Sequence, residues 1–391
     1  MVERATWRIE TETSEIEIAL DEGQIIADGS ALAIAERELE LKRGEVADLF
    51  GLARNLNKSG AVKVGVLSKS ERGYALVDGT PPTSFKAGKV ALHRRMSTAD
   101  AFQAITRSCV RHFRLNEPLV FEARSPEALH QARVALRRLR SAFSLFGDVV
   151  ADARLDRIKR RLREVSAQFG DARNHDVYLA RASQAAEEVD DGEIIARLET
   201  DRVAAYDRVI ATLESRRFRA LMLDVAEWIE CGPWVLASEP ATKARRDRFV
   251  EEFAAEILDR RRRKVKRNGR KHINLDADAR HQVRIDSKKL RYASEFFASL
   301  VEGKKHRKRH RAFIAALEDL QSSLGELNDI RTGHAMLAGL TEAAESRESK
   351  AAPFLVPASR SGDRRGQRDD LLLQSALDAH RTFVKAKPFW R

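Results

Sequence analysis

Two rows of basic side chains recur along the chain at helical spacing. The first row, at intervals of three, four and three residues, consists of His130, Arg133, Arg137 and Arg140. At about 100° per residue these positions share one face of a helix, next to an apolar face. The guanidinium group of arginine matches the oxygens of a phosphate, and neighbouring arginines repel one another unless an anion lies between them. The first row therefore predicts a phosphate-binding surface, with the histidine as an additional donor.

The second row repeats the first row 151 residues later, at His281, Arg284, Lys288 and Arg291. Residues 128–147 (ALHQARVALRRLRSAFSLFG) and 279–298 (ARHQVRIDSKKLRYASEFFA) are identical at eight of twenty positions. Each copy is followed by a second pair of matching segments, FGDARN at 169–174 and LGELND at 324–329. Such a repeat implies two similar helical halves. If the halves pack around an approximate two-fold axis, both rows line one shared cavity, which suits a linear polyanion better than a small ligand.

Hydrophobic periodicity places both rows on helices. From about residue 97 onward the apolar residues recur with a helical period, and no proline occurs between Glu127 and Gly232. The candidate helices lie near 97–116, 126–147, 152–169, 173–189, 193–214, 217–231, 241–266, 277–301, 306–325, 328–345 and 369–386. Residues 346–368 are polar and interrupted by Pro353 and Pro357, which predicts a mobile loop.

The first 92 residues follow a different pattern. Apolar and polar residues alternate with a period of two at 16–18, 36–42 and 62–67, which predicts strands, and a short helix is expected at 44–57. The fold is therefore mainly α with a small N-terminal β-rich segment. We expect this segment at about 1–78, followed by a linker at 79–94 and a helical domain at 95–391. The two halves of the helical domain are expected at about 95–235 and 236–391.

The net charge of +12 is unevenly distributed. Residues 1–92 contain 12 Lys+Arg and 15 Asp+Glu, a net of −3, which leaves 59 and 44, a net of +15, for the remaining residues. This asymmetry indicates an anionic partner for the helical part. We expect no membrane-spanning helix, because no run approaches eighteen apolar residues, and the first residues lack the pattern of a signal peptide. Cys109 and Cys231 fit neither a disulfide framework nor a metal-ligand spacing, as is typical of core thiols in a cytosolic protein.

The doubled row resembles the CHAD domain, the conserved-histidine α-helical domain. Further matching residues are Asn116-Glu117, RNHDV at 173–177, Leu327-Asn328-Asp329 and FVKAKPFW at 383–390, so that the resemblance covers about 95–391. It implies two pseudo-symmetric four-helix bundles beside a basic cavity that binds inorganic polyphosphate, and some family members associate with polyphosphate granules. By motif position it assigns polyphosphate binding to His130, Arg133, Arg137, Arg138, Arg140, Arg173, His281, Arg284, Lys288, Lys289, Arg291 and Tyr292. The chain departs from the family where Asn174 replaces the Asp that follows Arg173.

Residues 15–23, 36–44 and 67–74 resemble the second half of a CYTH domain, the triphosphate-tunnel fold often found ahead of CHAD. The opening strand of that family, with its Glu-x-Glu-x-Lys signature, is missing, and a closed barrel needs about eight strands. We therefore expect the tunnel to be truncated or to be completed by another chain, as in a homo-oligomer; an incorrectly assigned start codon is a third explanation. Tentative ligands for Mg²⁺ or Mn²⁺ in such a tunnel are Glu15, Glu17, Glu38 and Glu40.

Three functions follow from these patterns. We expect a polyphosphate-binding protein that needs no cofactor and has no catalytic residues, located in the cytoplasm or on polyphosphate granules. The alternative is a metal-dependent inorganic triphosphatase that uses the CYTH-like segment and Mg²⁺ or Mn²⁺. Nucleic-acid binding is a second alternative, but base stacking needs exposed aromatic side chains. The helical aromatics fall on apolar faces, where we expect a core, at Phe143, Phe146, Phe296 and Phe297.

Overall fold

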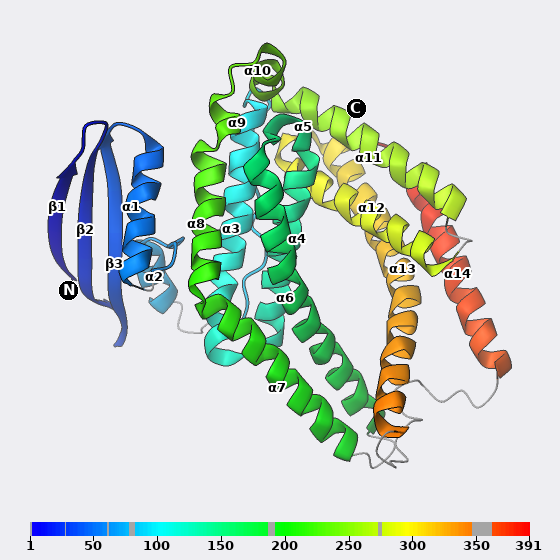
Figure 1. Cartoon of the computed structure of the whole chain (residues 1–391). Coiled ribbons are helices and arrows are strands. Elements are labelled where there is room, and N and C mark those ends of the chain that lie inside the picture. The colour runs from blue at the N-terminus through cyan, green and yellow to red at the C-terminus, as the bar shows by residue number, and fades with distance from the viewer. Residues whose placement is uncertain are drawn as a thin grey trace. The chain divides into compact units, whose positions relative to one another are not determined.

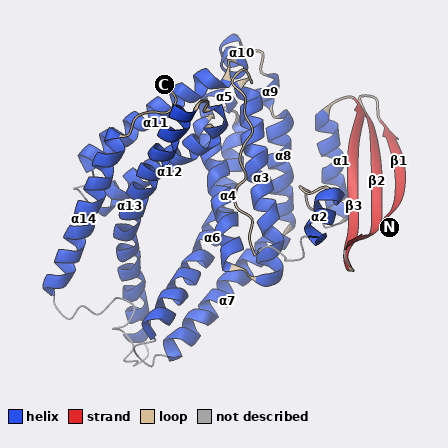
Figure 2. Cartoon of the chain, turned by 180° about the vertical axis from the view of Figure 1, so that it is seen from behind, coloured by secondary structure: helices blue, strands red, loops and turns tan. Residues whose placement is uncertain are grey.

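The structure of the protein is a computed structural model. It describes residues 2–27, 29–60, 62–77, 83–186, 192–272, 276–345 and 362–391. Three strands at the N-terminal end are followed by helices, as expected for a mainly α protein (Figures 1 and 2). The chain divides into two compact units, of which the first comprises 1–88, 106–173 and 204–243 and the second 89–105, 174–203 and 244–391. Among the described helices, none combines the length and apolar character needed to cross a bilayer.

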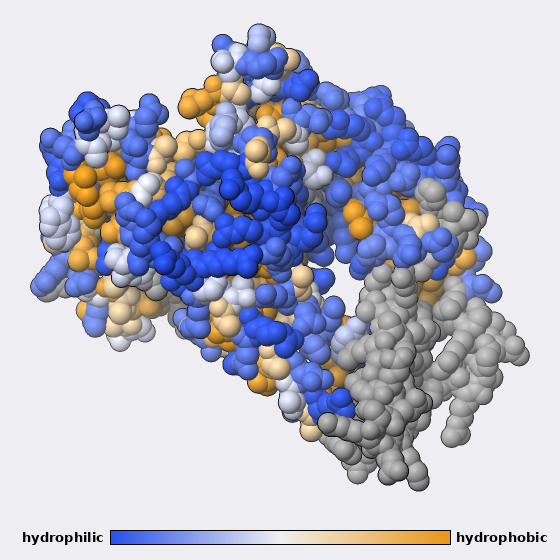
Figure 3. All heavy atoms as spheres, viewed as in Figure 1, coloured by the Kyte–Doolittle hydropathy of each residue, from blue (hydrophilic) through white to orange (hydrophobic). Residues whose placement is uncertain are grey.

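The N-terminal strands form one antiparallel sheet in the order β1 (Val2–Glu10), β2 (Glu15–Ala27) and β3 (Ser30–Arg43). Trp7 lies opposite Ile18, and Ile18 lies opposite Leu39, so these apolar side chains share one face of the sheet. That face is partly exposed, since Trp7 retains 52% of its surface, and Figure 3 shows apolar residues over the strands. The expected strands at 16–18 and 36–42 are confirmed.

Two short helices accompany the sheet. The helix expected at 44–57 is α1 (Val46–Ser59), which packs against α8 (Arg216–Cys231). The second, α2 (Lys69–Val77), packs on β2 and β3 and was not expected from the sequence. Gly44 has a φ of +106° beside Ser14, where a side chain would clash, so the turn between β3 and α1 requires glycine.

The strand expected at 62–67 is wrong. Residues 62–67 are irregular, although their alternation is that of a strand. The carbonyl oxygen of Val64 accepts a hydrogen bond from Arg114 Nε at 2.9 Å, and that of Val66 accepts one from Arg111. Both arginines lie on α3 (Thr98–Ala123). Side chains of α3 thus bond to two carbonyls of this segment in place of a neighbouring strand.

Four helices that lie wholly or partly in the first unit surround an aromatic core: α3, α4 (Pro126–Leu145), α6 (Ala153–Ala186) and α8. The ring of Phe113 lies 5.8 Å from those of Phe169 and Phe218, and Phe143 lies 5.2 Å from Trp228. Ser125 caps α4, because its hydroxyl accepts a hydrogen bond from the amide of Ala128. The other helices between residues 146 and 249 are α5 (Gly147–Val150), α7 (Gly192–Glu214), α9 (Pro233–Leu236) and α10 (Pro240–Asp247).

The second unit contains a four-helix bundle of α11 (Val250–His272), α12 (Ala277–Phe296), α13 (Lys304–Glu345) and α14 (Gly362–Lys385). Each helix packs on the next, and α14 packs on α11 (Figure 1). The C-terminal FVKAKPFW segment closes this bundle, since Phe313 lies within 5.6 Å of the rings of Phe383, Phe389 and Trp390. The indole of Trp390 also donates a hydrogen bond to Asp259 at 3.0 Å. The residues of this segment therefore contribute to the packing of the bundle.

Several expected helix boundaries are wrong. The breaks expected near Gly170 and Gly325 are absent, because α6 and α13 run through them, and α3 continues through Pro118. The helix expected at 241–266 is two helices, since residues 248–250 bond instead to 96–98 in a short β-bridge. Of the expected mobile loop, 346–361 lie outside the described residues, and 362–368 belong to α14.

Candidate anion-binding site

The first row of basic residues on α4 faces α6 in an antiparallel register. The guanidinium of Arg133 lies against Gly170, with Nε 3.7 Å from the position that a Cβ would occupy there. His130 lies three residues before Arg133, and Arg173 lies three residues after Gly170. The charge of Arg173 lowers the pKa of His130. Seven residues away in the other direction, the charge of Arg163 acts on Arg140. We call this set the first ladder: His130, Arg133, Arg137 and Arg140 on α4 with Arg163, Gly170 and Arg173 on α6.

The second unit repeats this arrangement between α12 and α13. The guanidinium of Arg284 lies against Gly325, with Nη2 3.6 Å from the position of a Cβ. Arg291 forms an ion pair with Glu318 at 3.3 Å. The second ladder therefore consists of His281, Arg284, Lys288 and Arg291 on α12 with Glu318 and Gly325 on α13. The predicted repeat is thus present as a repeated packing geometry as well as a repeated sequence.

Both ladder glycines lie inside continuous helices. Glycine inside a helix costs about 1 kcal/mol relative to alanine, yet both helices continue through it. In each case the space beside the glycine is filled by the guanidinium of the facing arginine, Arg133 or Arg284. The sequence marks Gly170 and Gly325 as matching positions, but the arginine contact depends on helix packing and was missed.

Electrostatics in the first ladder favour an anion. Burial lowers the pKa of His130, and the charges of Arg173, Arg137 and Arg133 lower it further, while Glu127 opposes them. The Nδ1 atom of His130 is buried without a hydrogen bond to any residue that the structure describes. The imidazole is therefore neutral at pH 7 and is surrounded by cationic side chains. A bound phosphate would offset this positive field and would supply an acceptor.

The predicted residues differ in accessibility. His281 is exposed, whereas Arg284, Lys288 and Lys289 are half-buried. Arg138 and Tyr292 are 6% and 1% exposed, so they lie behind the two rows. The charge of Arg138 lowers the pKa of the buried His112. The ring of Tyr292 lies 5.4 Å from the guanidinium of Arg291. Their direct contact with a ligand stays a prediction, and the structure favours a supporting position.

Asn116 and Glu117 of the CHAD resemblance have structural roles. The amide of Asn116 donates a hydrogen bond to the carbonyl of Phe85 and accepts one from its N–H, both at 2.9 Å. Glu117 is 1% exposed and pairs with Arg114 and with Lys63. These two residues fix the segments 83–88 and 62–67 on α3. They do not belong to the first ladder.

The four tentative metal ligands are all ion-paired. Glu15 pairs with Arg8 at 3.1 Å, and Glu17 and Glu40 pair with Lys42 at 3.4 and 2.9 Å. Glu38 binds Arg4 at 2.6 Å and Lys69 at 2.7 Å.

A different carboxylate set in the sheet lies close enough together to hold a cation: Asp21, Glu36 and Glu38. Asp21 is fully buried, and its pKa is held well below the usual range by hydrogen bonds from Arg4 and Lys69. Lys69 also reaches Glu36, which Arg72 contacts as well. Three cations thus balance three carboxylates. A hard divalent ion prefers open carboxylate and water ligands, so these residues do not fit a ready metal site.

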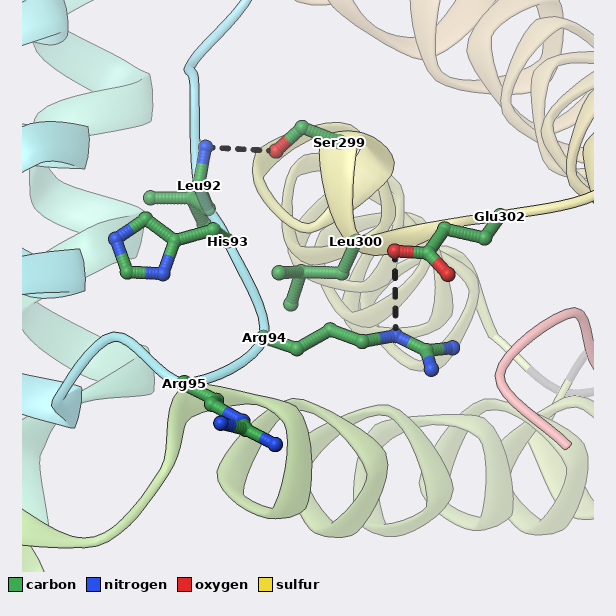
Figure 4. Close-up of a pocket in the computed structure, with 7 residues that line it drawn as sticks. All are labelled: Leu92, His93, Arg94, Arg95, Ser299, Leu300 and Glu302. Atoms are coloured by element: carbon green, nitrogen blue, oxygen red, sulfur yellow. Dashed lines mark hydrogen bonds and ion pairs between the residues drawn. The ribbon is translucent and has the colours of Figure 1, made fainter.

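A surface cavity of about 310 Å³ lies in the second unit. Its lining residues are Leu92, His93, Arg94, Arg95, Ser299, Leu300 and Glu302 (Figure 4). Arg94 pairs with Glu302 at 3.7 Å, and the hydroxyl of Ser299 accepts a hydrogen bond from the amide of Leu92 at 2.9 Å. No residue of either ladder lines this cavity.

The chain is similar to several known proteins. A family model described as the CHAD domain matches residues 104–338. The crystal structure of the CHAD domain from the plant Ricinus communis aligns with a TM-score of 0.61 and 27% identity, covering 78% of this chain and 97% of that one. PptA from Streptomyces chartreusis aligns with a TM-score of 0.46 and 18% identity over 74% of this chain and 99% of its own.

An inorganic triphosphatase of Haemophilus influenzae is 41% identical over 73 residues, which is 19% of this chain. The chain covers 21% of the length of that relative.

Proposed function

Since the chain belongs to the CHAD domain family, we propose that it binds inorganic polyphosphate along the first and second ladders. The observation that carries the proposal is the half-buried row on α4, where three arginines surround the neutral His130. From His130 to Arg140 the row spans about 15 Å at 1.5 Å per residue. A linear polyanion neutralises several of these charges at once, whereas a single phosphate reaches one or two.

Polyphosphate fits the site better than nucleic acid does. Phe143, Phe146 and Phe296 are fully buried, and Phe297 is 1% exposed, as expected for core residues. Exposed aromatic side chains such as Trp7, Tyr74 and Phe249 lie outside α4 and α12. Single-strand binders stack bases on exposed aromatics. The ladders offer cations without such a platform, which suits a ligand that consists of phosphate alone.

A matched pair of double variants tests the proposal. Arg133→Ala with Arg284→Ala removes one arginine from each ladder, and Arg260→Ala with Arg261→Ala removes two arginines from α11. Both pairs lower the net charge equally. We expect the ladder pair to weaken binding of polyphosphate of defined length by about 100-fold, because each variant removes one charge-assisted contact. The α11 pair should cost less than about five-fold. Equal losses, measured by calorimetry, would contradict a defined site.

Competition distinguishes the two anions. Unlabelled RNA is titrated against bound, labelled polyphosphate at equal phosphate concentration and fixed salt, because both affinities depend on ionic strength. We expect RNA to displace little of the label. Full displacement by RNA would favour nucleic-acid binding.

Inorganic triphosphatase activity is a second candidate, favoured by the 41% identity over 73 residues to an inorganic triphosphatase. The ion-paired carboxylates of the sheet argue against turnover. We therefore expect no phosphate release from tripolyphosphate with Mg²⁺ or Mn²⁺. Steady release that is lost in Glu38→Ala would establish the second candidate.

Association with polyphosphate granules follows from the same proposal. A fluorescent fusion of the full chain should gather on granules in cells that store polyphosphate. The ladder double variant, Arg133→Ala with Arg284→Ala, should remain diffuse at equal expression. Granule localisation of both proteins would separate this role from the ladders.

A further inference from the structure

The two ladders differ at one pair of equivalent positions. The contacts of Arg133 with Gly170 and of Arg284 with Gly325 fix the register in each unit. Seven residues onward in α4 and seven back in α6, Arg140 faces Arg163. The same steps in α12 and α13 lead from Arg284 to Arg291 and from Gly325 to Glu318. The buried leucines Leu162 and Leu317, one residue before Arg163 and Glu318, support the alignment of α6 with α13.

In the second ladder this position is neutralised within the protein. Arg291 pairs with Glu318 and with Glu295, both at 3.3 Å. Glu318 comes from the facing helix, and Glu295 lies one turn further along α12. Ser144 is the α4 counterpart of Glu295, by the same offset of 151 residues. Both carboxylates of the second unit are thus replaced in the first unit, by an arginine and a serine.

Within the described part of the chain, the corresponding arginines of the first ladder have no counter-ion. Arg140 is half-buried, and among the described residues it makes no hydrogen bond or ion pair. Burial lowers its pKa, and the charge of Arg163 lowers it further. Two arginines that approach each other without a carboxylate are unfavourable in the free protein. The repulsion is relieved when an anion binds between them.

We propose that Arg140 and Arg163 form a phosphate-binding subsite at one end of the first ladder, and that Glu318 closes the equivalent place in the second. The inference rests on the proposed function for the identity of the ligand, a phosphoryl unit of polyphosphate. Two guanidinium groups offer several N–H donors to its oxygens. Arg163 is thereby a binding residue that lies outside both repeated rows. The two halves of the domain are unequal, and the first binds phosphate more tightly.

Reciprocal substitutions test the subsite. Arg163→Glu gives the first ladder the pairing of the second, and Glu318→Arg does the reverse. We expect Arg163→Glu to weaken binding of polyphosphate about ten-fold or more, as expected for the loss of a charge-assisted contact. Arg157→Glu, an exposed position on the same helix, changes the charge equally and should cost less than about three-fold.

The double variant Arg163→Glu with Glu318→Arg keeps the net charge of the wild type. It should move the subsite to the second ladder, where the arginine introduced at position 318 would face Arg291. A further Arg140→Ala should then no longer weaken binding, although Arg140→Ala alone weakens binding by the wild type. If Arg140→Ala costs the same affinity in both backgrounds, Arg140 does not act together with Arg163, and the subsite is wrong.

The thermal midpoint of the free protein provides a second readout. Arg163→Glu should raise it, because a new pair with Arg140 replaces a repulsion, and this also shows that the variant folds. Equal affinities for Arg163→Glu and Arg157→Glu, with tight binding by the wild type, would overturn the subsite alone. If the wild type does not bind polyphosphate, the proposed function fails. Pyrophosphate binding that depends on Arg163 would then still support the subsite, and its independence from Arg163 would overturn it.

Discussion

His130 is the residue whose ionisation should respond most directly to a ligand. Burial and three arginines keep its pKa below the ordinary value of 6.5, so it is neutral at pH 7 in the free protein. A bound phosphate adds negative charge beside the ring and raises this pKa. Binding therefore takes up a proton between the free and the bound pKa, and affinity increases as the pH falls through that window.

This linkage gives a prediction for the wild type and for His130→Gln. Affinity for long-chain polyphosphate should increase from about pH 8 to about pH 6, where the internal phosphates of the ligand remain ionised. His130→Gln should bind with less pH dependence. Calorimetry in two buffers of different ionisation enthalpy measures the protons taken up. Equal proton uptake by both proteins would contradict a role for His130.

At the scale of elements, the contact between α4 and α6 leaves room for a methyl group at Gly170 but not for a larger side chain. Alanine should be tolerated there, since its Cβ would lie 3.7 Å from Arg133 Nε, an ordinary contact distance. Gly170→Ala should also stabilise the helix by about 1 kcal/mol. Valine extends further and should displace the guanidinium. We expect Gly170→Val to weaken polyphosphate binding about ten-fold.

A glycine elsewhere provides the control for Gly170→Val. Gly51 lies in α1, and nothing approaches the position of its Cβ within 4 Å. Gly51→Val should leave binding unchanged. Calorimetric titration of the three glycine variants, with circular dichroism to confirm helix content, checks the expectation. Full affinity in Gly170→Val would show that polyphosphate binding does not depend on the contact of Arg133 with Gly170.

A second element-scale prediction concerns the attachment of segment 83–88 to α3. Asn116 satisfies both backbone groups of Phe85 and also donates to the carbonyl of His112. Asn116→Ala should destabilise the protein by about 1–3 kcal/mol, because it leaves buried polar groups unpaired. Asn55→Ala, at an exposed position of α1, should have little effect. Urea unfolding measures the free energy of unfolding of both variants. An equally small decrease in both would contradict a stabilising role for the hydrogen bonds of Asn116.

Local periodicity predicted the rows, most helices and two of the three strands, because it reports which face of an element is apolar. It failed where partners distant in sequence decide the outcome. The alternation at 62–67 did not reveal that Arg111 and Arg114 would take its carbonyls. The pattern predicts a helix end at Gly170, but α6 continues through this residue, with Arg133 against it. Arg163 gained its significance from the facing Arg140 and from the ion-paired Arg291 in the other half.

At the scale of the whole molecule, charge is balanced differently in its parts. The carboxylates of the sheet are neutralised by nearby cations, with Asp21 between Arg4 and Lys69. The first ladder instead has a half-buried Arg140 without a counter-ion among the described residues. The N-terminal carboxylates are therefore neutralised within the sheet, whereas Arg140 of the first ladder keeps a positive charge that the proposed phosphate ligand would offset. The net charge of +12 does not by itself reveal this contrast.

Each unit also contains a buried histidine whose protonation at acidic pH should destabilise the folded protein. His112, in the first unit, bonds to the carbonyl of Phe85 at 2.9 Å, and a hydrogen bond with Gln131 also acts on its ring. His380, in the second unit, packs closely against Gly269, and its Nε2 atom is buried without a hydrogen bond to any described residue. Burial lowers both pKa values, assisted by Arg138 at His112 and by Arg270 at His380.

The unfolded chain therefore binds more protons than the folded protein just below the ordinary histidine pKa of about 6.5. The stability that these histidines contribute is complete above that pH and is lost as the pH falls below it. We expect the thermal midpoint to fall by a few degrees between about pH 7.5 and about pH 5.5. His112→Gln combined with His380→Gln should reduce this fall, whereas His93→Gln, at an exposed position, should not. If the double variant loses as much stability on acidification as the wild type, the two buried histidines are not the acid-sensitive groups.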